Sequence, residues 1–292
     1  MFSLKILGNR KESVDGGLGE VISTGGVWQS HMNSILFHVV LLAYLLATLG
    51  FWCYFGVRQA VLFRVAHGLV YVGLIFQTVL LAQRLWTPMV WSSVSASLAL
   101  LAWAIGIGYI VAWWRYRIEA LGSFMLPLAF FAVVLSSVPA EAVLPLPSSL
   151  QRLLLVVHIV LAVLGYAALA LTFCAGVMYL IQERQLKSKQ PGMWSNRLPS
   201  LWVLDEMNAK ALALGLPLLT QGVITGSVWA KAMRGSYLSW SMTSLPLLLA
   251  LALYVLLLGG RYTLGWQGKK AAFAAVTGFL LVLVSYVVHT SA

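Results

Sequence analysis

The sequence predicts an all-α protein, a polytopic integral membrane helical bundle with about eight transmembrane helices. Its 292 residues are 61% hydrophobic and only 9% charged, with a mean hydropathy of +0.89. Soluble domains are nearer half apolar and a quarter charged, so this composition cannot cover a water-facing surface. The apolar residues also form runs of about 20, which is the length that a helix needs to cross a bilayer.

Eight such runs follow one another along the chain, and none alternates polar and apolar residues as membrane β-strands do. The fifth run is longer than a bilayer requires, so we expect its helix to protrude or tilt. In chain order, the expected spans are 34–57, 65–85, 93–114, 121–139, 150–182, 210–231, 243–260 and 271–290. Breaks between them are marked by Thr87-Pro88, Pro139 with Pro145 and Pro147, Pro191-Gly192 and Gly259-Gly260.

The residues before the first run have a different composition. Residues 1–31 are polar and glycine-rich, which predicts a flexible polar N-terminal tail in front of a transmembrane domain over 32–292. No short apolar core of a signal peptide occurs there. A second polar stretch, 191–206, carries Trp194 and Trp202 among charged residues and predicts an interfacial segment at the inner face.

The basic residues predict the orientation. One set of alternate loops holds twelve of them and the other set only four, so the first set is expected in the cytoplasm and both termini outside. The twelve are Arg58, Arg64, Arg115, Arg117, Arg184, Lys187, Lys189, Arg197, Lys210, Arg261, Lys269 and Lys270. Because the net charge of +11 lies in these short loops, it indicates topology rather than nucleic-acid binding. We expect a multi-pass protein of the bacterial cytoplasmic (inner) membrane with lipid as its surroundings.

Three of the five histidines are expected at one level of the membrane. Counting about 20 residues from the cytoplasmic end of each helix places His38, His158 and His289 at the outer boundary, on three different helices. His67 stands alone at the inner face, and His31 belongs to the tail. Imidazole ligates haem iron, and two facing rings fill both axial positions. The alternative for any one of them is an ordinary amphipathic residue at the boundary.

Other residues offer less chemistry. No paired carboxylates lie within a span, which gives an ion-coupled transporter little to work with. The two cysteines, Cys53 and Cys174, form no CxxC or CxxCH motif, so neither a redox pair nor covalent haem attachment is expected. Gly215, Gly222 and Gly226 suit close helix packing.

Three stretches in this order and spacing resemble the cytochrome c assembly family, the CcsA/HemX/YpjD-like group of haem-handling membrane proteins. They are Val157-His158-Ile159 with Leu164-Gly165-Tyr166, Gly215-Leu216-Pro217 through Trp229-Ala230, and Gly265-Trp266-Gln267-Gly268-Lys269-Lys270-Ala271. The resemblance covers about residues 93–292. It implies that His158 and His289 match the two outer histidines that ligate haem in the family's haem synthases.

The resemblance also has departures. In the synthases the outer loop is rich in tryptophan and ends in Trp-Asp-Pro-Lys-Glu. Of this pattern the chain keeps only Gly235, Tyr237 and Trp240. Trp240 is followed by Ser241, Met242, Thr243 and Ser244 in place of the last four residues of the motif. Gly259 stands where the synthases have an inner histidine. The chain is therefore more similar to the HemX/YpjD branch, with a degenerate loop that favours no enzymatic activity.

The leading hypothesis is a membrane protein of cytochrome c biogenesis that binds or handles haem, with haem b as the expected cofactor. His158 and His289 would be the axial ligands, with Trp240 and Tyr237 nearby and His38 in reserve. The first alternative is a non-catalytic accessory subunit that retains the fold without haem chemistry. A small-molecule transporter is the second. Partners would be other membrane or cytochrome c biogenesis subunits.

Overall fold

A computed structural model describes most of the chain. Its backbone is described for residues 5–57, 59–85, 93–138, 149–188, 198–235 and 245–291. Side chains are described within 31–57, 59–83, 93–138, 151–188, 198–232 and 245–285, and at Gly235.

The all-α prediction is confirmed, and the described residues contain no strand. The elements are α1 (Lys5–Val57), α2 (Ala60–Leu85), α3 (Val94–Tyr116), the 3₁₀ turn η2 (Glu119–Leu121), α4 (Gly122–Ser136), α5 (Ser149–Ser188), α6 (Leu201–Arg234), α7 (Leu245–Thr263) and α8 (Lys269–Ser291). Seven spans of sufficient length and apolarity fall within the residues with described side chains. Helix α8 coincides with the eighth predicted run. Together these helices make the protein a multi-pass membrane protein.

Two element boundaries differ from the prediction. Helix α6 begins at Leu201 rather than near residue 210, because the Ser200 side chain caps it by accepting from the Val203 N–H. Residues 201–206 are therefore the first turns of α6, and Trp202 on them is 71% exposed. Helix α1 begins at Lys5, so its backbone runs through the segment predicted as a tail; the flexibility of that segment stays a prediction.

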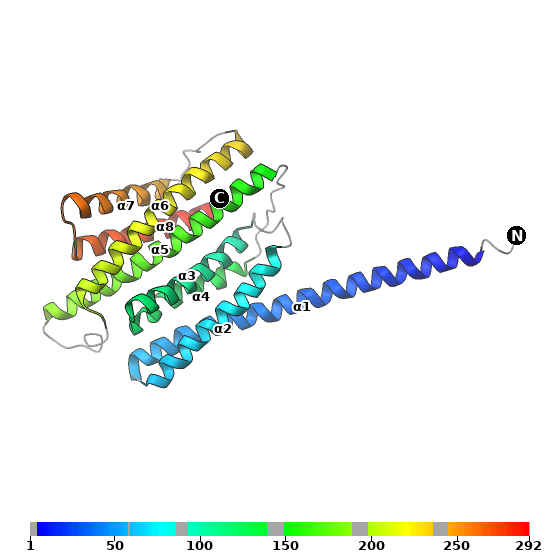
Figure 1. The fold of residues 1–292 in the computed structure, drawn as a ribbon, viewed down its shortest axis with the longest axis horizontal. Coiled ribbons are helices and arrows are strands. Elements are labelled where there is room, and N and C mark those ends of the chain that lie inside the picture. Colours follow the sequence, from blue (N-terminus) through cyan, green and yellow to red (C-terminus); the bar gives the residue numbers. More distant parts are fainter. Residues whose placement is uncertain are drawn as a thin grey trace.

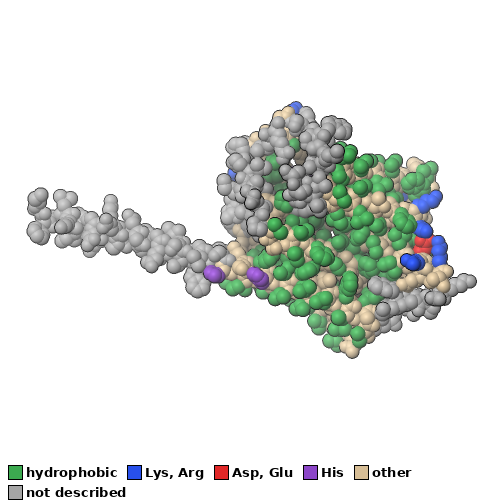
Figure 2. Space-filling model, turned by 180° about the vertical axis from the view of Figure 1, so that it is seen from behind, with side chains coloured by type: hydrophobic (Ala, Val, Ile, Leu, Met, Phe, Trp, Pro, Cys, Tyr) green, Lys and Arg blue, Asp and Glu red, His purple; other side chains and the backbone are tan. Residues whose placement is uncertain are grey.

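The helices cross the bundle alternately in opposite directions (Figure 1). Helices α1, α2, α3 and α4 pack together, α5 packs with α6 and α8, and α7 packs on α8; the two groups meet where α3 contacts α5. Arginines and lysines gather at one end, which we call the basic end, and histidines lie where α1 leaves the bundle, which we call the distal end (Figure 2). The predicted orientation, which puts the basic end in the cytoplasm, stays a prediction.

A buried hydrogen-bond chain joins the first three helices. The Tyr44 hydroxyl donates to Gln77 Oε1 over 2.8 Å, and Gln77 Nε2 donates to the Ala99 carbonyl over 2.8 Å. Gln77 is only 4% exposed, so its amide would be costly without these partners. The two bonds fix α1, α2 and α3 relative to one another.

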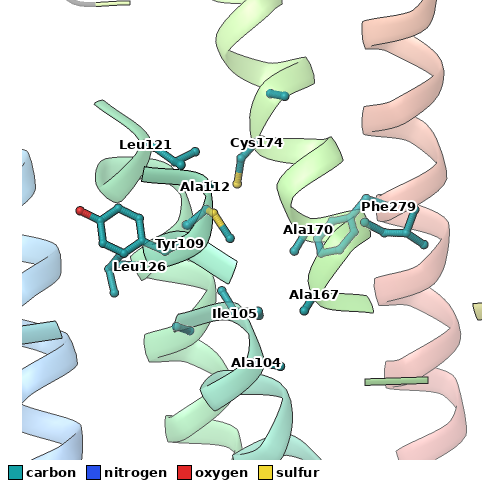
Figure 3. Close-up of a cluster of buried hydrophobic side chains, with 14 of the residues drawn as sticks. Ala104, Ile105, Tyr109, Ala112, Leu121, Leu126, Ala167, Ala170, Cys174 and Phe279 are labelled. Carbon is teal, nitrogen blue, oxygen red and sulfur yellow. The ribbon is translucent and has the colours of Figure 1, made fainter. Parts of the chain in front are cut away.

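Small side chains form the contact between the two helix groups. Ala104 and Ile105 of α3 face Ala167 and Ala170 of α5, and Phe279 of α8 packs on the other side of α5 (Figure 3). The Phe279 ring stacks on Phe173, with centroids 4.8 Å apart. Small residues let helix backbones approach closely in a membrane, where packing replaces the hydrophobic effect as the main attraction between helices.

A network of charged and polar side chains connects the helices of the second group, α5 to α8, at the basic end. Both guanidinium NH groups of Arg261 in α7 donate to the Asp205 carboxylate of α6 over 3.2 and 3.0 Å, and one also donates to Asn208. Asp205 Oδ1 accepts from the Gly268 N–H over 3.0 Å, while Asn208 donates to the Thr172 carbonyl of α5. The network thus ties α5, α6, α7 and the turn before α8.

Arg261→Ala is expected to lower the free energy of unfolding by about 3 kcal/mol, because it leaves a shielded carboxylate without its partner. The matched control is Lys210→Ala, which removes the exposed partner of Glu206 one turn along α6 and should cost less than about 0.5 kcal/mol. Unfolding of the purified protein in detergent measures both. Equal losses for the two variants would contradict the structural role of Arg261.

Candidate functional site

The candidate site lies at the contact between α5 and α6, where glycines leave room for the neighbouring helix. A Cβ atom added at Gly165 would lie 2.7 Å from the Leu219 N atom, and one added at Gly222 would lie 3.1 Å from Ala162 Cα. At Gly215 the added atom would lie 3.0 Å from Ala168 Cβ. The predicted packing role of Gly215 and Gly222 is therefore confirmed, and the two backbones run side by side.

His158 sits at the distal part of this contact. Its Nδ1 atom lies 2.7 Å from the Gly222 carbonyl oxygen. A Cβ atom added at Gly226 would lie 2.6 Å from Cε1 and 2.7 Å from Nδ1 of the ring. The imidazole therefore lies against the bare backbone of α6 at Gly226, partly buried, and its position depends on the absence of a side chain there.

The hydrogen bond decides the tautomer of His158. A carbonyl oxygen has no proton to give, so Nδ1 must carry the hydrogen and donate it. Nε2 is then the nitrogen whose lone pair a metal would use when the ring is neutral. A ring held through Nδ1–H by a backbone carbonyl, with Nε2 left for a metal, is the usual arrangement of metal-binding histidines. Among the described residues, no group of three or more His, Cys, Asp or Glu could hold a metal ion.

The backbone of α8 carries His289 to the same end of the bundle. The stacked pair Phe173 and Phe279 gives the register of α5 against α8. His158 lies 15 positions before Phe173, and His289 lies 10 positions after Phe279. At a helical rise of about 1.5 Å per residue, the two Cα atoms differ in height by roughly 7 Å, about one and a half turns. The His289 side chain lies outside the described residues.

The remaining predicted ligands do not join His158 in the described part of the chain. His38 is exposed on α1, where its Nδ1 atom contacts the Ser34 carbonyl at 2.6 Å, and α1 packs mainly on α2 and α4. Its role as a reserve ligand stays a prediction. Tyr237 and Trp240 lie outside the described residues. His31 is exposed on α1, away from the α5–α6 contact.

His67 has surroundings that the sequence analysis missed. Its Nδ1 atom lies 2.9 Å from the Tyr109 hydroxyl, and its ring centroid lies 4.3 Å from that of Trp113 and 5.5 Å from the stacked Phe63. Tyr71 meets the ring edge-on. Phe63, His67 and Tyr71 recur at every fourth residue of α2, so the sequence predicts that they share one face of the helix. The same spacing gives no information about Tyr109 and Trp113, their partners on α3.

The family described as "Cytochrome C assembly protein" matches residues 91–291. The chain belongs to this family. The match covers α3 to α8 and includes both His158 and His289.

Three cytochrome c biogenesis proteins named CcsA illustrate the relationship, each aligned over 67% of this chain. That of Chlamydomonas reinhardtii is 31% identical over 202 residues, that of Microcystis aeruginosa 29% over 243, and that of Prochlorococcus marinus 28% over 218. The alignments span 56%, 74% and 71% of these proteins, respectively. The chain thus matches little more than half the length of the algal relative.

Gly226→Ala is expected to displace the His158 ring, because the new methyl group would overlap Cε1 and Nδ1. Loss of an outer-shell contact typically lowers metal affinity about 10- to 100-fold, so the haem binding proposed below should weaken by that factor when the purified variant is titrated with haem. Gly259→Ala is the control, since an added Cβ there has no atom within 4 Å. Unchanged haem affinity in Gly226→Ala would contradict the positioning of His158 by α6.

Proposed function

We propose that this member of the cytochrome c assembly family holds haem b at the distal, extracytoplasmic face of the membrane. The single observation that carries the proposal is the hydrogen bond between His158 Nδ1 and the Gly222 carbonyl. With Nδ1–H donated to this carbonyl, Nε2 is the ring nitrogen that would bind iron. His289, from α8, is proposed as the second axial ligand.

The surroundings of His158 favour an apolar macrocycle. Its neighbours Val156, Val157 and Val160 on α5 are between 37 and 42% exposed, so apolar surface is available beside the ring. Iron held between two neutral imidazoles needs no carboxylate, and none of the described carboxylates lies near this end. Tyr237 and Trp240, in the connection between α6 and α7, are proposed to pack against the bound haem.

Each part of the chain has a separate task in this proposal. When bound, haem supplies an iron centre that can accept two axial nitrogens. Gly222 orients the His158 ring, Gly226 makes room for it, and α8 brings His289 to the same end of the bundle. The carried or bound haem would serve cytochrome c biogenesis, the process named for the CcsA relatives.

A non-catalytic accessory subunit is the second candidate, favoured by the residues after Trp240. Serine, methionine and threonine there supply no carboxylate or ammonium for presenting haem. Such a subunit would act through other membrane proteins of the same process. The bacterial cytoplasmic membrane is our proposed location, while the relatives come from algae as well as cyanobacteria.

His158→Gly is expected to remove most of the haem, lowering the Soret absorbance of the purified protein at least about tenfold. Because the substitution empties the ring's place against Gly226, added imidazole should restore a large part of that absorbance in the presence of haem. Spectra with and without dithionite measure both effects.

His67→Ala is the control for loss of a histidine from the opposite end, and it should retain haem. A wild-type protein without Soret absorbance, even after addition of haem, would exclude the haem proposal and favour the accessory subunit. A His158→Gly protein that keeps its full haem content would exclude His158 as the ligand.

A further inference from the structure

We propose that the basic end carries a binding site for one anionic phospholipid, in a cavity beside the start of α8. This cavity is lined by Trp266, Lys269, Lys270 and Phe273 and has a volume of about 420 Å³. It lies at the opposite end of the bundle from His158. The inference therefore does not depend on the haem proposal.

The wall of the cavity is held in place by the turn between α7 and α8. Trp266 packs on Gly260, where an added Cβ atom would lie 2.6 Å from the indole ring. Gly268 donates its N–H to Asp205, which also holds Arg261. Trp266 and the first turn of α8 are thus fixed before any ligand arrives, which reduces the cost of binding.

The two ammonium groups at the cavity have no carboxylate partner in the described part of the chain. Lys269 lies over the Phe273 ring, with its Nζ atom 5.7 Å from the centroid, and no described carboxylate pairs with Lys269 or Lys270. The four described acidic residues are occupied elsewhere: Glu119 by Tyr54, Glu183 by Lys187, Asp205 by Arg261 and Glu206 by Lys210.

The position of the two lysines adds to the need for an anion. They are the first residues of α8, whose first turn contains no acidic residue. The positive end of the helix dipole and two ammonium groups therefore coincide and repel one another. The Asp205 carboxylate, which accepts from the Gly268 N–H at this helix start, is shared with Arg261. A phosphate between the ammonium groups would relieve this repulsion.

The remaining lining identifies the ligand as a lipid rather than a free anion. Trp266 and Phe273 present aromatic surface, and the adjacent Tyr262 and Leu264 are 80 and 68% exposed. Aromatic residues of this kind mark the boundary between water and hydrocarbon. Because basic pockets at the cytoplasmic ends of membrane helices suit anionic headgroups, the ligand should have a negative phosphate on the lysines and an acyl chain along the two rings.

The test uses the full chain, purified in detergent, stripped of lipid and titrated with palmitoyl-oleoyl phosphatidylglycerol or phosphatidylcholine in native mass spectrometry. The wild type should bind one phosphatidylglycerol in preference to phosphatidylcholine. Lys269→Gln/Lys270→Gln should weaken the phosphatidylglycerol affinity about thirtyfold, from two nearby lysines. Phe273→Ala, which keeps the charge, should weaken it severalfold.

The matched control, Lys187→Gln/Lys210→Gln, removes the same charge from the same end but outside the cavity, and should change the affinity less than about threefold. An equal loss in this control would overturn the proposal in favour of general attraction to the basic end. Equal binding of both lipids would also overturn it, as would displacement of phosphatidylglycerol by equimolar inorganic phosphate. Melting temperatures close to that of the wild type confirm that the variants remain folded.

Discussion

The close approach of α5 and α6 is the constraint on which the rest of the second helix group depends. Gly165 of α5 and Gly222 of α6 allow backbone atoms to meet where side chains would otherwise keep the helices apart, while Gly215 and Gly226 leave room for Leu169 and His158. Such contacts gain dispersion energy over a long surface and need no polar group in the bilayer. Helix α8 then packs on α5, and the basic end is closed by Arg261 and Asp205. At the distal end, the His158 imidazole lies beside Gly226.

Much of the fold could be predicted from the sequence, because a bilayer imposes one length on every span. All eight runs correspond to helices, and the long fifth run became a helix of 40 residues, about 60 Å, twice the thickness of the hydrocarbon. The start of α6 was missed because Asp205 and Glu206 resemble loop residues. Asp205 is instead paired with Arg261, a partner 56 positions later that no local pattern reveals.

The candidate site was predictable only in part, for a related reason. Counting residues from the charged loops assigned His158 and His289 to one level, since the rise per residue of a helix is fixed. Which way a ring points depends on the neighbouring helix. The bond from His158 to the Gly222 carbonyl, and the enclosure of His67 by Tyr109 and Trp113, both involve residues from other helices. Neither leaves a periodic signal in the sequence.

The acceptor for His158 is a peptide carbonyl, and this has an evolutionary consequence. Carbonyl groups are common to every amino acid, so mutation at position 222 cannot delete the acceptor in the way that replacing an aspartate would. Natural selection that preserves the imidazole's tautomer would therefore mainly restrict the size of the side chain at position 226 and the distance between α5 and α6. Homologous sequences could diverge widely in polar character along α6 while preserving the same orientation of the ring.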